Sequence, residues 1–168
     1  MVATARGGGS AIVTLPADEQ ILITREFDAP RHLVYRAWTT PDLVRRWWAG
    51  KRGTMTGVEI DLRVGGRWRY VMTVNDGAEL VFHGEFRDIV PDERIVTTEM
   101  LQMPGAPDSD EGAPVNTITF TEHDGRTTLT LLTQCENKEL RDMILASGME
   151  VGMQEQMDLL EELAISLR

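Results

Sequence analysis

The sequence predicts a single α+β domain in which a curved antiparallel sheet of about seven strands holds a long C-terminal helix. Three observations lead to this prediction. Segments of strand character follow one another from residue 55 to residue 135, short glycine-containing turns separate most of them, and an amphipathic helix ends the chain. Because that helix must bury its apolar stripe, we expect it to lie across the concave face of the sheet.

The first strand is expected over residues 20–27, where apolar residues alternate with more polar ones. Two short helices are predicted directly after this first strand. Asp28 can cap the first helix, and Thr40 can cap the second, with Pro41 in its first helical position. Neither helix is long enough to be stable alone in water, so both must pack against the rest of the domain.

Six further strands are predicted as an antiparallel meander joined mainly by hairpins. Gly65-Gly66, Asn75-Asp76-Gly77 and His123-Asp124-Gly125 suit tight turns, because glycine reaches positive φ at little steric cost. A long acidic loop over residues 104–114 interrupts the series. The predicted strands cover residues 55–64, 67–74, 79–90, 94–103, 115–122 and 126–135.

Two helical segments are predicted at the end of the chain, over residues 137–147 and 148–167. The second has one mostly apolar face, since suitable residues recur in it at steps of three and four. That face contains Met149, Met153, Gln156, Leu160, Leu163 and Leu167.

The composition excludes several classes of protein. A net charge of -10 argues against a nucleic-acid-binding protein, and no apolar run approaches the roughly 20 residues that span a bilayer. Residues 1–18, with three successive glycines, are expected to be a flexible tail before a domain over residues 19–168. The N-terminus does not resemble a secretory signal and Cys135 is the single cysteine, so we expect a cytoplasmic protein. No cofactor or metal is predicted, because no Cys/His cluster or phosphate-binding loop is present.

Four stretches of the chain carry a resemblance to a known family: "REFDAPRHLVYRAWTTPDLVRRWW", "DLRVGGRWRY", "HGEFRDIVPDERIVTTE" and "SGMEVGMQEQMDLLEEL". Together they resemble the activator of heat shock protein 90 ATPase homologue family, within the START-like or SRPBCC superfamily. The resemblance extends over residues 20–167. It implies the helix-grip fold, in which a sheet and a long helix enclose a cavity. Better-understood relatives bind lipids, hormones or polyketides, and some cyclise them.

Alternation along the strands indicates which side chains face the C-terminal helix. Trp68, Tyr70 and Met72 share one face of their strand, and Phe82 is expected to face the same way from the next strand. Methionines are expected to supply a deformable lining, although ordinary core filling explains them equally well. Trp38 and Trp47 either anchor the short helices or border the cavity. The predicted ligand-binding residues are Trp38, Trp47, Trp68, Tyr70, Met72, Phe82, Met100, Met149 and Met153.

The function predicted from these residues is binding of a small hydrophobic or aromatic molecule, lipid-like or polyketide-like, between the sheet and the C-terminal helix. No catalytic residue is predicted, since no histidine has an obvious partner and Glu99 points outward if Met100 points inward. An enzyme of the cyclase or hydrolase type is the first alternative. The second is a co-chaperone. The eukaryotic co-chaperones carry an extra N-terminal domain, whereas only about 18 residues precede the first strand here, which argues against this alternative. The sequence leaves a homodimer open.

Overall fold

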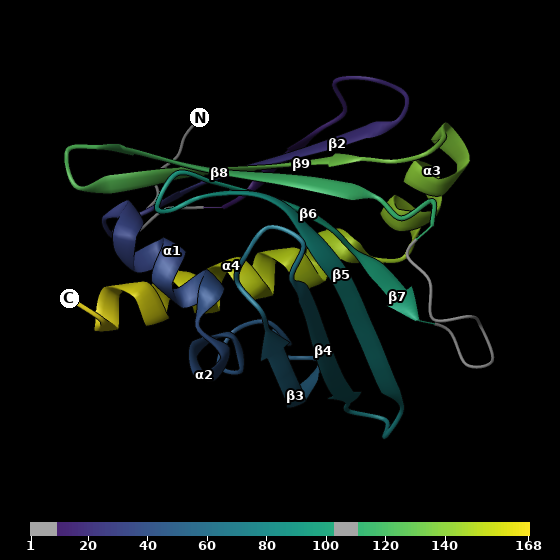
Figure 1. Ribbon diagram of the computed structural model, residues 1–168, viewed down its shortest axis with the longest axis horizontal. Coiled ribbons are helices and arrows are strands. Elements are labelled where there is room, and N and C mark those ends of the chain that lie inside the picture. The colour runs from purple at the N-terminus through teal and green to yellow at the C-terminus, as the bar shows by residue number, and fades with distance from the viewer. Residues whose placement is uncertain (1–9, 103–110) are drawn as a thin grey trace.

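The computed structural model describes residues 10–102 and 111–168 (Figure 1), and the predicted acidic loop therefore lies largely outside the described residues. Within those ranges the chain forms nine strands and four helices. The elements are β1 (Ile12–Thr14), β2 (Gln20–Phe27), α1 (Arg31–Thr39), α2 (Pro41–Val44), β3 (Gly53–Ile60), β4 (Arg67–Val74), β5 (Glu79–Val90), β6 (Arg94–Thr98), β7 (Met100–Gln102), β8 (Val115–His123), β9 (Arg126–Gln134), α3 (Lys138–Ala146) and α4 (Met149–Ser166).

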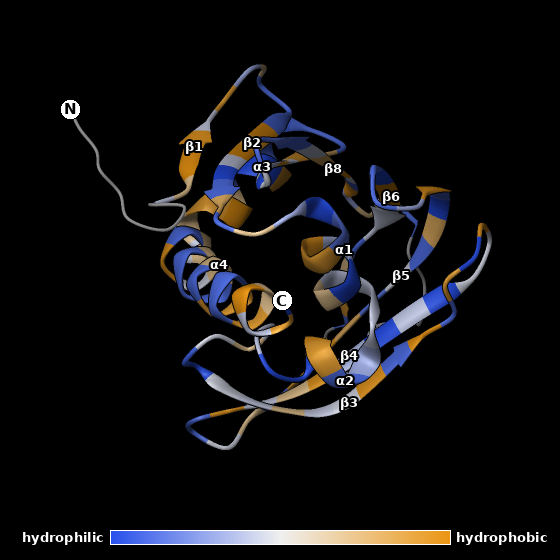
Figure 2. Cartoon of the chain, turned by 90° about the vertical axis from the view of Figure 1, so that its left-hand side faces the viewer, coloured by the Kyte–Doolittle hydropathy of each residue, from blue (hydrophilic) through white to orange (hydrophobic). Residues whose placement is uncertain are grey.

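All strand pairs are antiparallel, in the order β1-β2-β9-β8-β6-β5-β4-β3, with β7 also paired to β5. The sheet curves around α1 and α4 (Figure 2). The predicted fold class is therefore confirmed. More strands are present than the seven expected, because β1 precedes the first predicted strand and Glu99 separates β6 from β7.

At Gly84, β5 makes a close approach to the neighbouring backbone. A Cβ atom at this position would lie 1.9 Å from the carbonyl oxygen of Thr98 and 2.6 Å from the indole nitrogen of Trp68. Only glycine tolerates so close an approach. Two residues further along, the register between β5 and β6 shifts between Phe86 and Asp88. A bulge of this kind increases the local twist of a strand, so β5 is irregular at two neighbouring positions.

The short helices are placed as predicted, but one predicted cap is wrong. The residue before α1 is Pro30, without a side-chain cap, and Asp28 instead forms an ion pair with Arg126 (3.2 Å). Thr40 does precede α2 and Pro41 does open it, yet the Thr40 side chain makes no capping hydrogen bond. Since α2 has only four residues, packing and not capping must hold it in place.

Ordered structure begins earlier than the predicted boundary at residue 18. Residues 1–9 of the predicted tail lie outside the described residues, but β1 pairs with β2 from Ile12 to Thr14. Ala11 is buried and exchanges two hydrogen bonds with the side chain of Gln154 on α4. Three residues are enough to extend a sheet edge that already exists.

A buried ion pair joins α4 to the sheet. The Arg25 side chain, on β2, is 2% exposed, and its Nη2 lies 2.7 Å from Glu161 Oε1 while its Nη1 lies 2.8 Å from Asp158 Oδ1. Glu161 Oε2 also accepts a hydrogen bond from the main-chain nitrogen of Asp28 (2.8 Å). Both carboxylate oxygens of Glu161 are thus satisfied, which fixes the distance between the C-terminal half of α4 and β2.

Replacing Arg25 by methionine is expected to lower the free energy of unfolding by about 3 kcal/mol, because Glu161 then keeps a buried charge without its cation. Urea denaturation measures the change. Asp158→Asn is the matched control and should cost less than about 1 kcal/mol, since the Asp158 side chain is 62% exposed. Equal losses for the two variants would contradict this assignment.

Candidate ligand-binding site

Four aromatic side chains form a cluster on the concave side of the sheet. The register places Tyr70 beside Phe82 and Trp68 beside Gly84, so these strands turn the expected side chains to one face. The Trp48 ring packs edge-on against Phe82 (4.7 Å between centroids) and Tyr70 (5.2 Å), and Trp68 packs against Tyr70 at 4.7 Å. We call Trp48, Trp68, Tyr70 and Phe82 the aromatic cluster.

Trp38 and Trp47 lie apart from this cluster and anchor the short helices. Their rings are 4.9 Å apart, and Trp38 also packs against Phe120 of β8 at 6.1 Å. Trp47 is 2% exposed and donates a hydrogen bond from its indole nitrogen to the carbonyl oxygen of Ala37 (3.0 Å). Trp47 and Trp48 lie in the turn after α2 and point in different directions, and it is Trp48, absent from the predicted set, that reaches β4 and β5.

The predicted methionines do not all lie on the concave side of the sheet. Met72 and Met153 are buried, and Met149 is half-buried at the start of α4. Met100 pairs with His83 of β5, and this pair alternates with the pair of Phe82 and Leu101. Met100 therefore belongs to the outer face, and Glu99 rather than Met100 continues the inward series of β6.

Several inward-facing apolar side chains keep exposed surface. Trp48, Leu80, Phe82, Leu131 and Met149 are all half-buried, although each packs against the buried core. Covering this exposed apolar area with a hydrophobic partner is energetically favourable, because it removes the area from water.

A chain of polar groups joins β9, β8 and the residue between β6 and β7. Thr133 Oγ1 donates to Asn116 Oδ1 (2.7 Å), and Asn116 Nδ2 donates to Glu99 Oε1 (3.0 Å). Glu99 keeps some exposed area, yet protein surrounds its carboxyl group closely enough that burial raises its pKa. The hydrogen bond from Asn116 lowers that pKa and offsets part of the rise. Burial raises the pKa of Tyr70, and the negative charge of Glu99 raises it further.

Sequence reasoning left the orientation of Glu99 dependent on that of Met100, and the predicted set took Met100 as the inward residue. The alternation starting at Ile95 supplies the correct answer. Ile95 is 1% exposed and Thr97 pairs with the inward-facing Asn116, so the same period of two places Glu99 inward.

The loop after α2 connects the aromatic cluster to α4. The side-chain nitrogen of Gln156 donates to the carbonyl oxygen of Trp48, and Glu155 accepts a hydrogen bond from the main-chain nitrogen of Lys51 (3.2 Å). Arg52 lies against Gly152, where a Cβ atom would come 2.4 Å from its guanidinium. The missing side chain of Gly152 therefore lets this loop lie directly on the helix.

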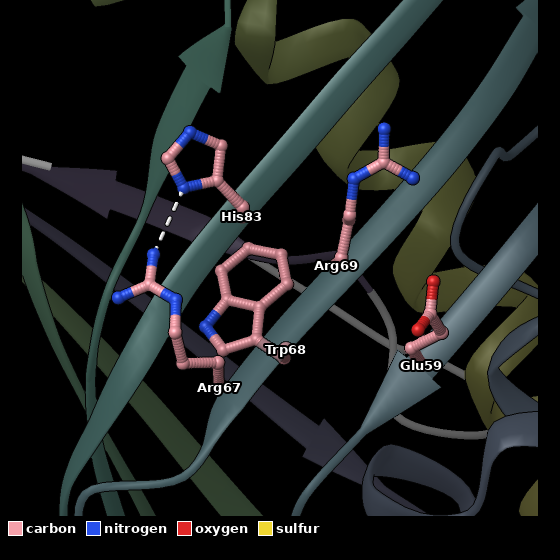
Figure 3. A pocket seen from close by; sticks show the side chains of 5 residues that line it. All are labelled: Glu59, Arg67, Trp68, Arg69 and His83. Atoms are coloured by element: carbon pink, nitrogen blue, oxygen red, sulfur yellow. Dashed lines mark hydrogen bonds between the residues drawn. The ribbon is translucent and has the colours of Figure 1, made fainter. Parts of the chain in front are cut away.

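A cavity of about 200 Å³ lies on the other face of the sheet, lined by Glu59, Arg67, Trp68, Arg69 and His83 (Figure 3). Arg67 Nη2 lies 3.2 Å from His83 Nδ1, and His83 is 4% exposed. His83 and Arg69 are paired across β4 and β5 and alternate with Tyr70 and Phe82. This cavity is thus separate from the predicted space between the sheet and α4.

Two kinds of feature are missing from the ranges that the structure describes. No group of three or more His, Cys, Asp or Glu side chains is placed to hold a metal ion there. Nor is any helix in those ranges long and apolar enough to cross a membrane.

Comparison with known families shows to which family the chain belongs. The family model described as "Activator of Hsp90 ATPase homolog 1-like protein" matches residues 28–164, which is most of the domain. The chain belongs to this family. The resemblance found in the sequence is thereby confirmed, and the helix-grip arrangement of sheet and C-terminal helix agrees with it. No curated protein matches the chain.

Solved structures share the fold at low sequence identity. A protein of Rhodobacter sphaeroides has a TM-score of 0.83 at 23% identity, with 94% of this chain and 99% of that chain covered. A Mycobacterium smegmatis protein has a TM-score of 0.81 at 26% identity, covering 92% and 96%. An AHSA1-like protein of Aeromonas hydrophila has a TM-score of 0.63 at 22% identity, covering 87% and 93%.

Glu99→Gln is expected to gain stability relative to the native protein as the pH rises. Folding raises the pKa of Glu99, so its stabilising contribution is complete below the pKa of an unfolded glutamate, about 4.3, and is lost as the pH rises through the folded value. Glutamine stays neutral and loses nothing. Urea denaturation between pH 4 and pH 9 measures the difference.

The control for this prediction is Glu150→Gln, an exposed position in the first turn of α4. Its stability difference from the native protein should not follow the same trend. If the Glu99→Gln and native curves run parallel over the whole pH range, Glu99 is not in the environment described.

Proposed function

We propose that this protein binds a small hydrophobic or aromatic ligand, lipid-like or polyketide-like, between the concave face of the sheet and α4. The observation that carries the proposal is the aromatic cluster, together with neighbouring inward-facing side chains that remain partly exposed. The residues assigned to the site are Trp48, Trp68, Tyr70, Met72, Leu80, Phe82, Leu131, Met149 and Met153.

Membership of the family supports this proposal at the level of the fold, because SRPBCC proteins commonly bind hydrophobic ligands. The residues in this chain add two specific arguments. Met149 and Met153 have flexible side chains that can repack around a guest. Trp48 follows a helix of only four residues, so its ring can move at little cost in secondary structure.

Binding energy would come mainly from burial of the exposed apolar area. The rings of Trp48 and Phe82 stand at about 70° to each other, so an inserted flat ligand can stack on one while meeting the edge of the other. Apolar area removed from water contributes about 25 cal/mol per Å², which makes a ligand with one or two rings sufficient for measurable affinity.

Fluorescence titration with the neutral dye N-phenyl-1-naphthylamine tests the proposal. We expect saturable binding by the native protein and about tenfold weaker binding by Phe82→Ala or Trp48→Ala, because one ring contact is lost in each. Val151→Ala is the control, since Val151 is 66% exposed on α4 and should leave the affinity unchanged.

Two results would count against the site. Absence of saturable dye binding would remove the proposal for this class of ligand. Equal affinities of the native protein, Phe82→Ala and Trp48→Ala would place any binding elsewhere on the molecule.

Catalysis on such a ligand is a second candidate, and one observation favours it. Glu99 and Tyr70 are titratable groups that face the proposed site, in the type of enclosed surroundings where acid–base catalysis operates. This candidate requires product formation that Glu99→Gln abolishes while ligand binding persists. Prolonged incubation of a bound ligand without any product would exclude it for that ligand.

A chaperone partner is supported only by the family to which the chain belongs. Its test is the ATPase rate of a heat shock protein 90 chaperone with saturating amounts of this protein. An unchanged rate would exclude stimulation.

A further inference from the structure

The cavity on the outer face of the sheet is built around two arginines of β4. Arg67 and Arg69 are two residues apart, so both side chains stand on the same face of the strand, roughly 7 Å apart along it. Across β5, β4 and β3 the register places His83, Arg69 and Glu59 in one row. These four side chains and Trp68 line the cavity of about 200 Å³ (Figure 3). Charged and polar groups from three strands therefore meet at one hollow.

A buried histidine holds one of the two guanidinium groups in place. Arg67 Nη2 lies 3.2 Å from Nδ1 of His83, whose exposed fraction is 4%. Because a guanidinium group can only donate, Nδ1 accepts this hydrogen bond and the ring hydrogen stays on Nε2. An enclosed imidazole is a rigid support, so Arg67 loses little conformational freedom when it meets a ligand. His83 is thus a positioning residue for the guanidinium of Arg67.

The second guanidinium group, that of Arg69, stands between His83 and Glu59 in Figure 3. The register pairs Arg69 with Glu59, yet no carboxylate in the described part of the chain forms an ion pair with Arg69. By contrast, Arg87 on the neighbouring strand is paired with Glu85 at 3.2 Å. The cavity wall therefore presents a cation whose donors a ligand can use.

We propose that this cavity binds a small oxyanion, the phosphate or carboxylate group of a metabolite, between the guanidinium groups of Arg67 and Arg69. The planar fork of a guanidinium matches two oxygens of either group. Glu59 is the single carboxylate among the lining side chains, so two arginines leave an excess of positive charge at this place in a protein of net charge -10. A water molecule occupies about 30 Å³ in the liquid, so the cavity has room for the anionic group and part of the molecule that carries it.

Other classes of ligand fit these side chains less well. A metal cation would meet two guanidinium groups, and within the described ranges no group of three or more His, Cys, Asp or Glu side chains is placed to hold one. An apolar molecule would take water from the two arginines and give them no hydrogen bond in return, which costs free energy. Glu59 adds a preference, because it can accept from a hydroxyl or ammonium group beside the anionic group of the ligand.

Inorganic phosphate and acetate are the probes that test this site. Each is titrated into the native protein at neutral pH and constant ionic strength, with chloride making up the balance. Heteronuclear NMR of the arginine side-chain Nε–H groups reports which residues respond. We expect saturable shifts of the Arg67 and Arg69 signals with at least one of the two anions, and the anion that binds more tightly identifies the group.

Charge variants separate a built site from a general effect of charge. Arg69→Gln should weaken binding about tenfold, because charge-assisted hydrogen bonds are lost. Arg94→Gln is the matched control, since Arg94 is an exposed arginine outside the cavity that pairs with Asp88, and it should leave the affinity within about twofold. Glu59→Gln should act in the opposite direction and tighten binding about threefold, because it removes the carboxylate from the lining.

Two variants of His83 test its positioning role. The side-chain oxygen of asparagine can take the place of Nδ1 as an acceptor, so His83→Asn should keep the affinity within about twofold. Leucine accepts no hydrogen bond, so His83→Leu should weaken binding about threefold or more and shift the Arg67 signal before any anion is added. Thermal unfolding shows that both variants are folded. Equal losses in the two variants would contradict the role assigned to His83.

Two results would overturn the oxyanion site. The first is the absence of saturable shifts when phosphate or acetate replaces all of the chloride. The second is equal weakening by Arg69→Gln and Arg94→Gln, which would show that the anions respond only to overall charge. Arg69 lies on the face opposite the aromatic cluster, so Arg69→Gln should leave the affinity for the dye unchanged, and the outcome here is separate from that of the proposed function.

Discussion

The architecture depends on one buried contact, between Arg25 of β2 and Glu161 of α4. Arg25 occupies an inward position on its strand, where an apolar residue would ordinarily stand, and its charge requires the carboxylate that α4 provides. A helix packed by apolar contacts alone can slide or rotate on a curved sheet. With both oxygens of the Glu161 carboxylate occupied, the pair admits only one position of α4 along its axis relative to β2.

The two ends of α4 consequently have different surroundings. Leu160, Leu163 and Ala164 are buried near the ion pair, with little or no exposed area. Toward the N-terminal end, Met149 is half-buried and Arg52 lies directly against Gly152. Burial and charge thus hold the C-terminal turns of α4, and contact with the loop after α2 holds its N-terminal turns.

The sequence was a good guide to the fold and a partial one to the site, for identifiable reasons. The alternation of Trp68, Tyr70 and Met72, and of Phe82 with Gly84, depends only on the period of two in a strand, and the register agrees with it. Which of two adjacent tryptophans turns toward the sheet depends on how α2 docks, and nothing in the sequence of four helical residues decides it. Met100 and Glu99 were exchanged because hydrophobicity was given more weight than the alternation that begins at Ile95. β1 was overlooked because three residues carry too little pattern to be recognised.

Trp48 touches both walls of the domain, with its ring on β4 and β5 and its main-chain oxygen held by Gln156 of α4. Because the main-chain link does not involve the ring, the side chain can rotate while the loop after α2 stays attached to the helix. The same residue is thus a fixed joint through its backbone and a movable surface through its indole ring.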